Sequence, residues 1–316
     1  MRSIVIYHSM TGNTKKIAEA IHAGMRQVSQ VGEQCDIARL KDVNTSDLLS
    51  YDLIGLGSPV MHRRELHNVT NFIERTMESV DGKHGFAFCT HGALPAHYLS
   101  RVVPAMMQRG LIIIGWNNWF CSAYYPVIPK PYFTDGHPDS IDLEEAEDFG
   151  REMVERSRKV YLGETQPIPA FPKGRGYDEI YDPPDIPQVP EEMRKEGYRA
   201  RVSIKFEVNL AKCNYPKCTV CVDNCPMDSI DFSVSPPIFT TECDQCYLCE
   251  QACPTGAIEV DYLHFQETHD HTTRIVLQKS LERFEAQGRF RRLVPLEDIG
   301  WDTPFWKVKH PRFKIT

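Results

Sequence analysis

Residues 2–28, RSIVIYHSMTGNTKKIAEAIHAGMRQV, form the stretch that decides the fold. Residues 3–8 are apolar and β-branched, which predicts a short strand. Residues 15–28 carry apolar side chains at helical spacing, which predicts a helix. The residues that join them are Ser9, Met10, Thr11, Gly12, Asn13 and Thr14. Such a turn presents backbone N–H groups and hydroxyls at the start of a helix, where the dipole favours an anion. The segment therefore predicts a phosphate site, with an ordinary capped turn as the alternative.

The alternation of strand and helix continues through the first half of the chain. Further strands are predicted at residues 35–40, 53–57, 85–89 and 111–116, and further helices at residues 68–78, 97–109 and 143–161. Five strands separated by helices predict an α/β fold with a doubly wound, five-stranded parallel sheet. In such a sheet a ligand lies beyond the carboxyl ends of the strands. The loops expected at that edge are residues 9–14, 58–64 and 90–96.

Over residues 2–163 the chain resembles the flavodoxin family. Three segments carry the resemblance, namely residues 9–14 as the FMN phosphate loop and two flavin-flanking loops, Gly57-Ser58-Pro59-Val60 and Thr90-His91-Gly92-Ala93. The resemblance implies bound FMN, with its phosphate held by the hydroxyls of Ser9, Thr11 and Thr14 and the amides of Gly12, Asn13 and Thr14. The isoalloxazine would lie between the other two loops.

The side chains available to stack on that flavin depart from the common aromatic pattern. The first flanking loop offers Val60, Met61 and His62, and the second offers His91. The two histidines either tune the reduced flavin electrostatically or face solvent. The pair Gly55 and Gly57 does not make a dinucleotide fingerprint, because the third glycine and the helix are missing. No nicotinamide site is predicted.

Two cysteine runs in the second half predict metal clusters. The first is C-x4-C-x2-C-x3-C-P at Cys213, Cys218, Cys221 and Cys225, and the second is C-x2-C-x2-C-x3-C-P at Cys243, Cys246, Cys249 and Cys253. The fourth cysteine of such a run ligates the other cluster, so two 4Fe-4S clusters with crossed ligands are expected. One would be held by Cys213, Cys218, Cys221 and Cys253, and the other by Cys243, Cys246, Cys249 and Cys225. Structural zinc and a disulfide framework are the alternatives, and both fit these spacings less well.

The second half resembles bacterial two-cluster ferredoxins over residues 206–262, which implies a small α+β ferredoxin-like domain. One departure is that four residues, 214–217, separate the first two cysteines where the usual spacing has two. Cys213 therefore either sits on a widened loop or is displaced as a ligand, which would leave a three-thiolate site suited to a 3Fe cluster.

The net charge and the cysteine content indicate which partners and which cell compartment the protein suits. The formal net charge is -7 over 316 residues, which offers no general attraction to nucleic acid or to anionic lipid. No apolar stretch reaches membrane-spanning length, and the eleven cysteines suit a reducing compartment, so a cytoplasmic protein is expected. Cys35, Cys89 and Cys121 lie in strand-like runs and are expected to be small buried hydrophobes.

The expected domain order is a flavodoxin-like FMN domain at 1–164, a Pro-rich linker at 165–200, the two-cluster ferredoxin domain at 201–262 and a C-terminal extension at 263–316. A strand is predicted within 199–210 and a helix at 279–286. The basic, aromatic extension either docks an acidic partner or a second protomer, or packs across its own domains. The segment His269-Asp270-His271 is either a metal pair or a polar loop.

Together these features predict an electron-transfer protein that couples one-electron and two-electron carriers. The arrangement resembles flavodoxin–ferredoxin fusion proteins of anaerobes, which implies a redox-protein donor or acceptor, either ferredoxin-like or a reductase complex, and allows a homodimer. One alternative is an FMN-dependent reductase of a small substrate, in which residues 116–142 wall a substrate site or cover the flavin edge. Another is a dedicated electron-delivery subunit of a larger redox complex.

Overall fold

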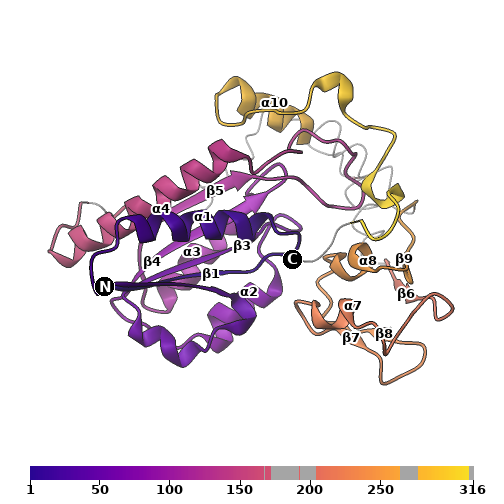
Figure 1. Ribbon diagram of the computed structural model, residues 1–316, viewed down its shortest axis with the longest axis horizontal. Coiled ribbons are helices and arrows are strands. Elements are labelled where there is room, and N and C mark those ends of the chain that lie inside the picture. The colour runs from indigo at the N-terminus through magenta and orange to yellow at the C-terminus, as the bar shows by residue number, and fades with distance from the viewer. Residues whose placement is uncertain (167, 172–191, 193–203, 264–276, 313–316) are drawn as a thin grey trace. The chain divides into compact units, whose positions relative to one another are not determined.

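The computed structural model describes residues 1–166, 168–171, 192, 204–263 and 277–312, drawn in colour in Figure 1. These residues divide into two compact units. Unit 1 comprises Met1–Ser122 and Gly136–Pro183, and unit 2 comprises Ala123–Asp135 and Pro184–Thr316. The predicted segment His269-Asp270-His271 and most of the Pro-rich stretch lie outside the described residues.

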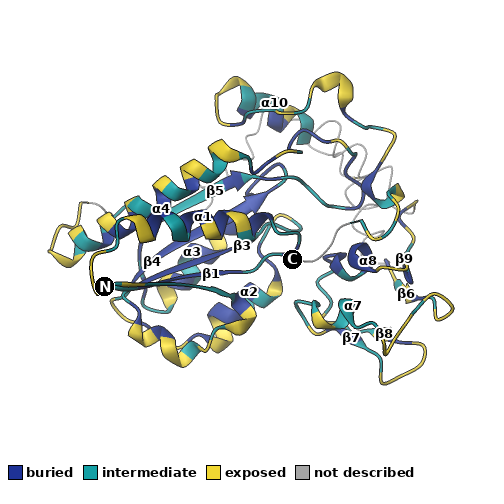
Figure 2. Cartoon of the chain, in the orientation of Figure 1, coloured by how far each residue is buried: buried dark blue, intermediate teal, exposed yellow. Residues whose placement is uncertain are grey.

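Unit 1 is built on a five-stranded, all-parallel sheet with the order β2-β1-β3-β4-β5. The strands are β1 (Arg2–Tyr7), β2 (Gln34–Arg39), β3 (Leu53–Pro59), β4 (His84–His91) and β5 (Ile112–Phe120). The central strands are buried on both faces, as Figure 2 shows, because parallel strands are covered by helices on both sides. The predicted fold class and all five strands are confirmed.

The helices of unit 1 follow the predicted pattern with two local differences. They are α1 (Asn13–Gln27), α2 (His67–Asn71), α3 (Tyr98–Gln108) and α4 (Ser140–Tyr161). The helix expected at 68–78 is split, because α2 continues into one π-helical turn, η3 (Phe72–Thr76). Two 3-10 turns, η1 (Leu40–Asp42) and η2 (Thr45–Ser50), connect β2 to β3.

Alternation along each strand divides the interior of unit 1 into two hydrophobic cores. Ile4 and Ile6 of β1 pack with residues of α2 and α3, whereas Val5 and Tyr7 pack with residues of α1 and α4. The two strand faces therefore each bury an apolar layer, which is the period-two pattern expected of a sheet covered on both sides.

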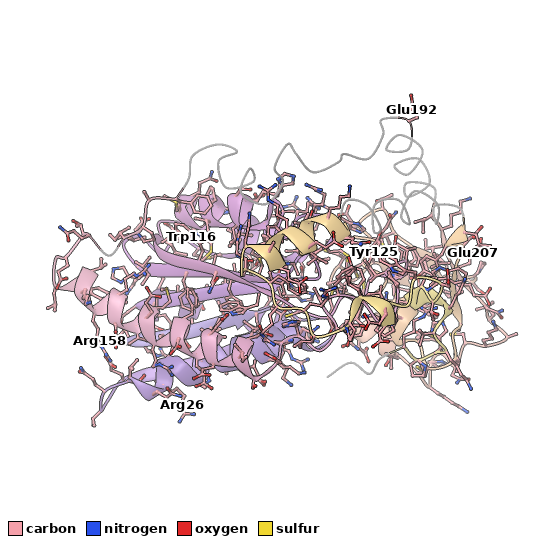
Figure 3. The ribbon with its side chains drawn as sticks, turned by 90° about the horizontal axis from the view of Figure 1, so that it is seen from above. Arg26, Trp116, Tyr125, Arg158, Glu192 and Glu207 are labelled. Atoms are coloured by element: carbon pink, nitrogen blue, oxygen red, sulfur yellow. The ribbon has the colours of Figure 1, made fainter. Side chains whose placement is uncertain are left out.

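Helices α1 and α4 approach each other closely through two glycines. A Cβ atom placed on Gly24 would lie 1.9 Å from the carbonyl oxygen of Glu147, and one on Gly150 would lie 2.1 Å from that of Ile21. Arg158 of α4, labelled in Figure 3, donates to the carbonyl of Val28 just beyond α1. Backbone contact at this distance leaves room for no side chain at either glycine.

Unit 2 contains two short antiparallel ribbons and two short helices. β6 (Phe206–Val208) pairs with β9 (Ile258–Val260), and β7 (Ile230–Asp231) pairs with β8 (Ile238–Phe239). The helices are α7 (Val220–Asp223) and α8 (Leu248–Ala252). The strand predicted within 199–210 is confirmed at β6, while residues 199–203 lie outside the described part.

The core of unit 2 is aromatic. Tyr247 and Tyr262 are buried with their ring centroids 5.8 Å apart. Tyr125, labelled in Figure 3, packs edge-on against Tyr247 at 5.4 Å, so the loop 123–135 contributes to this core.

The C-terminal extension packs within unit 2. It contains α10 (Gln278–Ala286), which confirms the predicted helix, and two 3-10 turns, η5 (Leu296–Asp298) and η6 (Phe305–Lys307). Backbone N–H groups of the extension bond to the loop 123–135, with Phe305 donating to Ile128 at 2.8 Å and Trp306 donating to Pro126 at 2.7 Å. Packing of the extension onto its own chain is therefore confirmed for these residues.

Candidate functional site

The first candidate site lies where β1 passes into α1. Gly12 has φ 92°, in the left-handed region that favours glycine, and it directly precedes the first residue of α1. Asn13 donates from Nδ2 to the carbonyl of Ser122 at 3.1 Å, and the Thr14 and Thr90 hydroxyls lie 2.8 Å apart in the interior. The predicted phosphate loop is therefore tied to the ends of β4 and β5, at the carboxyl edge of the sheet.

The two predicted flanking loops meet at the same edge and are bonded to each other. Val60 donates its backbone N–H to the carbonyl of Thr90 at 2.8 Å, and His97 donates to the carbonyl of Arg63 at 2.9 Å. Met61 and Arg64 close a two-residue turn through paired backbone bonds, with His62 and Arg63 at its tip. Both tip residues have positive φ, 51° and 68°, as a tight hairpin turn requires.

The remaining predicted residues of these loops differ in exposure. Met10, Ser58 and Ala93 are buried, which suits packing beneath a ligand. Thr11, Pro59, Val60 and Gly92 are partly exposed at the edge.

His91 is not a solvent-facing loop residue. It is the last residue of β4 and is only 4% exposed. Its Nε2 lies 2.9 Å from Oδ1 of Asn118, and its ring packs edge-on against Phe120. The solvent-facing alternative is therefore wrong for His91, while tuning of a flavin by His91 or His62 stays a prediction.

Several buried polar atoms at this edge suit a polar ligand. Within the described residues, Ser9 Oγ, His8 Nε2 and Asn68 Oδ1 are buried without a hydrogen-bond partner. Buried polar groups are nearly always satisfied, so three of them near one loop indicate a bound polar group. The first turn of α1 contains no acidic residue that would oppose an anion. The residues present therefore fit the phosphate of FMN.

Sequence reasoning did not identify His8 or Asn68 as site residues. Asn68 Nδ2 lies 3.2 Å from His8 Nδ1, which links the end of β1 to the start of α2. Burial and the charge of Lys41 together lower the pKa of His8 to about 4, so its imidazole is neutral at ordinary pH. The sequence signal that could have identified His8 is its position as a polar residue at the end of a buried strand.

The second candidate site is the group of cysteines in unit 2. The widened spacing after Cys213 is closed by a turn, because Lys217 and Cys218 both donate backbone N–H groups to the carbonyl of Asn214, at 2.8 and 3.2 Å. Tyr215 in this turn stacks on Phe232 with ring centroids 4.2 Å apart. The two extra residues therefore form a closed, stacked turn between Cys213 and Cys218.

Thiols of the two runs lie close to one another. Burial, together with the nearby Cys253 and Cys213 thiols, raises the pKa of the Cys221 thiol to about 11. Burial, together with Cys225 and Cys243, raises the pKa of Cys246 to about 12. Cys253 therefore lies close to members of the first run, and Cys225 lies close to members of the second.

This grouping suits iron-sulfur cores. Burial raises the pKa of Cys249 well above its ordinary value, and Cys246, Cys243 and Cys225 add to that effect. Crowded, buried thiols ionise together only where a cation compensates their charge, as an iron-sulfur core would. The charge of the Cys213 thiolate also contributes to the raised pKa of Cys221, so Cys213 lies near that thiol, while its role as a ligand stays a prediction.

The two runs end in the same local geometry. The N–H of Ser229 donates to Cys225 Sγ at 3.3 Å, and the N–H of Ala257 donates to Cys253 Sγ at 3.2 Å. Each donor stands four residues after its cysteine and follows a residue with positive φ, Asp228 at 50° or Gly256 at 62°. A two-residue or three-residue strand follows each of them, β7 or β9. Residues 253–260 therefore repeat the local geometry of residues 225–231.

The other cysteines and one further polar cluster have structural roles. Cys89 and Cys121 are buried as expected, and Cys35 is partly buried. His137, Asp139 and Asp142 gather at the start of α4, where Asp139 accepts from the N–H groups of Ile141 and Asp142. These three residues are explained by helix capping.

Comparison with known proteins finds relatives of both halves of the chain. A family model described as a flavodoxin domain matches residues 4–100, and one described as a 4Fe-4S binding domain matches residues 236–259. An NAD(P)H dehydrogenase (quinone) of Archaeoglobus fulgidus is 27% identical over 194 residues, which cover 50% of this chain and 98% of that protein. A ferredoxin of Methanothermococcus thermolithotrophicus is 34% identical over 55 residues, which cover 17% of this chain and 92% of the ferredoxin. A solved flavodoxin from the domain Archaea covers 50% of this chain and 99% of its own, at 23% identity and a TM-score of 0.40.

The sheet order and the family match define the amino-terminal part as a flavodoxin domain. The cysteine-rich part is a ferredoxin segment with a 4Fe-4S binding domain. The chain thus belongs to the flavodoxin–ferredoxin fusion proteins, and it is an electron-transfer protein of the FMN and iron-sulfur type. No helix in the described part of the chain is long and apolar enough to cross a membrane.

Proposed function

We propose that the chain passes electrons between two 4Fe-4S clusters and one FMN, and so couples one-electron carriers to two-electron carriers. When bound, FMN exchanges one or two electrons, and each cluster exchanges one. The protein supplies the binding sites, the placement of N–H donors on cluster sulfurs and the exclusion of water from the cysteine loops.

The observation that carries the proposal is the repeat in unit 2. Only the second run lies within the matched 4Fe-4S binding domain, at residues 236–259. The first run nevertheless has the same N–H to Sγ bond, the same positive-φ residue and the same following strand. A second cluster, held by Cys213, Cys218, Cys221 and Cys253, is therefore proposed beside the one held by Cys243, Cys246, Cys249 and Cys225.

For FMN we propose the phosphate ligands named by the flavodoxin resemblance. The buried hydroxyl of Ser9 and the amides at the start of α1 support this assignment. The flavin ring would lie between residues 58–62 and 90–93. The partners would be redox proteins, ferredoxin-like or a reductase complex, in the reducing cytoplasm that thiolate ligands need.

Anaerobic purification followed by cofactor analysis tests the composition. We expect one FMN per chain with about eight iron and about eight acid-labile sulfide, four of each per cluster. A preparation with about four iron per chain would contradict the second cluster. A protein without FMN would contradict the relay.

Paired cysteine substitutions test the crossed ligation. Cys253→Ser with Cys221→Ser should remove one cluster, about four iron, because both serve the same site. Cys253→Ser with Cys249→Ser should remove both clusters. Uncrossed ligation predicts the reverse, and Cys35→Ser, which lies outside unit 2, should retain all iron.

A second candidate function is reduction of a small substrate at the flavin. It is favoured by the similarity to the Archaeoglobus relative, an NAD(P)H dehydrogenase (quinone). Anaerobic addition of NADH or of reduced ferredoxin separates the two candidates. Flavin bleaching by ferredoxin alone supports the relay, whereas bleaching by NADH followed by quinone reduction supports the reductase.

A further inference from the structure

Glu250 is a buried carboxylate between two predicted cluster ligands, Cys249 and Cys253. The residue is only 2% exposed. Tyr262 donates its hydroxyl to Oε2 at 2.9 Å, and the guanidinium of Arg312 pairs with Oε1. His310 Nε2 also lies 3.4 Å from Oε1. Both carboxylate oxygens are therefore engaged, and two of the three partners come from residues 310–312.

Arg312 is buried as deeply as its partner. Its side chain is 4% exposed, and it also donates from Nε to the carbonyl of Val308 at 3.2 Å and from Nη2 to that of Trp306 at 2.6 Å. Its backbone N–H donates to the carbonyl of Gln251 at 3.0 Å. The end of the extension is thus bonded to α8 through both backbone and side chain.

The same segment covers the turn that follows Cys253. A Cβ atom on Gly256 would lie 2.9 Å from the His310 ring, so that ring rests directly on this turn. Gln251, which accepts from Arg312, donates from its own Nε2 to the carbonyl of Tyr124 at 2.7 Å. Residues 310–312 therefore hold the ligand-bearing helix and the ligand-bearing turn together, all within unit 2.

We propose that Arg312 is a positioning residue for the iron-sulfur site and that it neutralises Glu250 beside the cluster held by Cys249. The proposal rests on the proposed function, because it requires a cluster at these thiolates. A reduced cluster carries more negative charge than an oxidised one. An unpaired carboxylate charge in a poorly solvated interior would therefore make reduction of the nearby cluster less favourable. Pairing of Glu250 with Arg312 compensates that charge.

Three variants of the full chain, purified without oxygen, separate the effect of the Arg312 charge from the effect of its hydrogen-bond geometry. Arg312→Gln should move the cluster potential to more negative values and release iron to a chelator at least tenfold faster. Arg312→Gln combined with Glu250→Gln should return the potential towards that of the wild type, because the unpaired charge is gone. Arg312→Lys should keep the potential but still release iron faster, because the forked geometry is lost.

Lys309→Gln is the matched control. Lys309 is exposed and carries the same charge three residues away, so its removal should leave both potential and iron release unchanged. The readouts are a spectroelectrochemical titration of the clusters, the electron paramagnetic resonance spectrum of the reduced protein and the rate of iron release.

Unchanged potential and iron release in Arg312→Gln would overturn the proposal, and so would a shifted potential that the double variant leaves shifted. If Arg312→Gln does not fold, Arg312→Lys decides, because iron release at the wild-type rate would then contradict the positioning role. Failure of the proposed function looks different, since it would appear in the cofactor analysis of the wild-type protein, as missing FMN or missing iron, before any variant is compared.

Discussion

At the scale of single residues, the features that define the candidate sites are buried polar groups. The partners of these groups cannot be predicted from the neighbouring sequence. His8 was expected only as the end of a strand, yet its Nε2 is buried without a hydrogen-bond partner among the described residues, beside the predicted phosphate loop. Glu250 gives no signal in its own helix, because the arginine that pairs with it stands 62 residues away. The hydroxyls of the phosphate loop were predictable, since their spacing before a helix is itself the motif.

Ser9→Ala should weaken FMN binding. The Ser9 hydroxyl is buried and has no partner within the described residues, so it is available to a phosphate oxygen. Loss of one such bond should raise the Kd about tenfold, or about 1.4 kcal/mol. Fluorescence titration of the apoprotein with FMN measures this change. Ser46→Ala, at an exposed site, should bind FMN as the wild type does, and equal affinities in both variants would contradict the assignment.

His84 should make unit 1 less stable in acid. Burial lowers its pKa below the ordinary 6.5, and its Nδ1 lies 2.8 Å from the Ser157 hydroxyl. The folded chain thus prefers neutral His84, and its stability is fully present above about pH 6.5. As the pH falls below that value, the unfolded chain binds the proton first and stability decreases.

The measurement compares urea unfolding of the wild type and of His84→Gln at about pH 7.5 and about pH 5.5, on either side of the ordinary histidine pKa. The variant should lose less stability than the wild type between these two values. An identical loss in both proteins would show that His84 does not contribute to the acid sensitivity.

At the scale of elements, most of unit 1 was predictable because each strand and helix carries its own periodicity. The predicted strands at 35–40 and 53–57 correspond to β2 and β3 with small shifts of their ends. The π-helical turn after α2 and the 3-10 connection from β2 to β3 were not predicted, because their shape depends on packing. The turn at Tyr215 also required the structure, since its stacking partner lies beyond β7.

Gly150→Ala should destabilise the pairing of α1 with α4. Alanine favours a helix over glycine by up to about 1 kcal/mol, but its Cβ would lie 2.1 Å from the carbonyl oxygen of Ile21. The clash should dominate and lower the free energy of unfolding by about 1–3 kcal/mol. Chemical denaturation followed by circular dichroism tests this. The exposed control Glu155→Ala should change stability by less than about 0.5 kcal/mol, and a stabilised Gly150→Ala would refute the close contact.

At the scale of the whole molecule, the assignment of residues to units could not be predicted. A boundary near residue 164 separates the two families in sequence, and that domain division stays a prediction. The structure nevertheless assigns residues 123–135, which precede α4, to unit 2. Their backbone hydrogen bonds to residues 303–306 join segments that lie far apart in the chain. Local sequence patterns cannot predict such pairings.

Truncation after Val294 should affect the two cofactors unequally. The removed segment contains buried Ile299 and Phe305 and makes its described backbone bonds within unit 2. We expect the truncated protein to keep FMN and to lose iron and sulfide during purification. Cofactor analysis beside the full chain measures both. Retention of full iron with unchanged electron delivery would show that the extension is dispensable. Loss of FMN without loss of iron would contradict the assignment of the extension to unit 2.

The assignment of the loop 123–135 to unit 2 also has a consequence for folding during synthesis. The polypeptide passes from one unit to the other at residues 122/123, 135/136 and 183/184. During translation, residues 123–135 leave the ribosome long before the cysteine loops and the tail with which they pack. Domains generally fold as units in the order of their synthesis. The loop 123–135 therefore cannot complete its packing before residues 300–306, to which it bonds, have also left the ribosome.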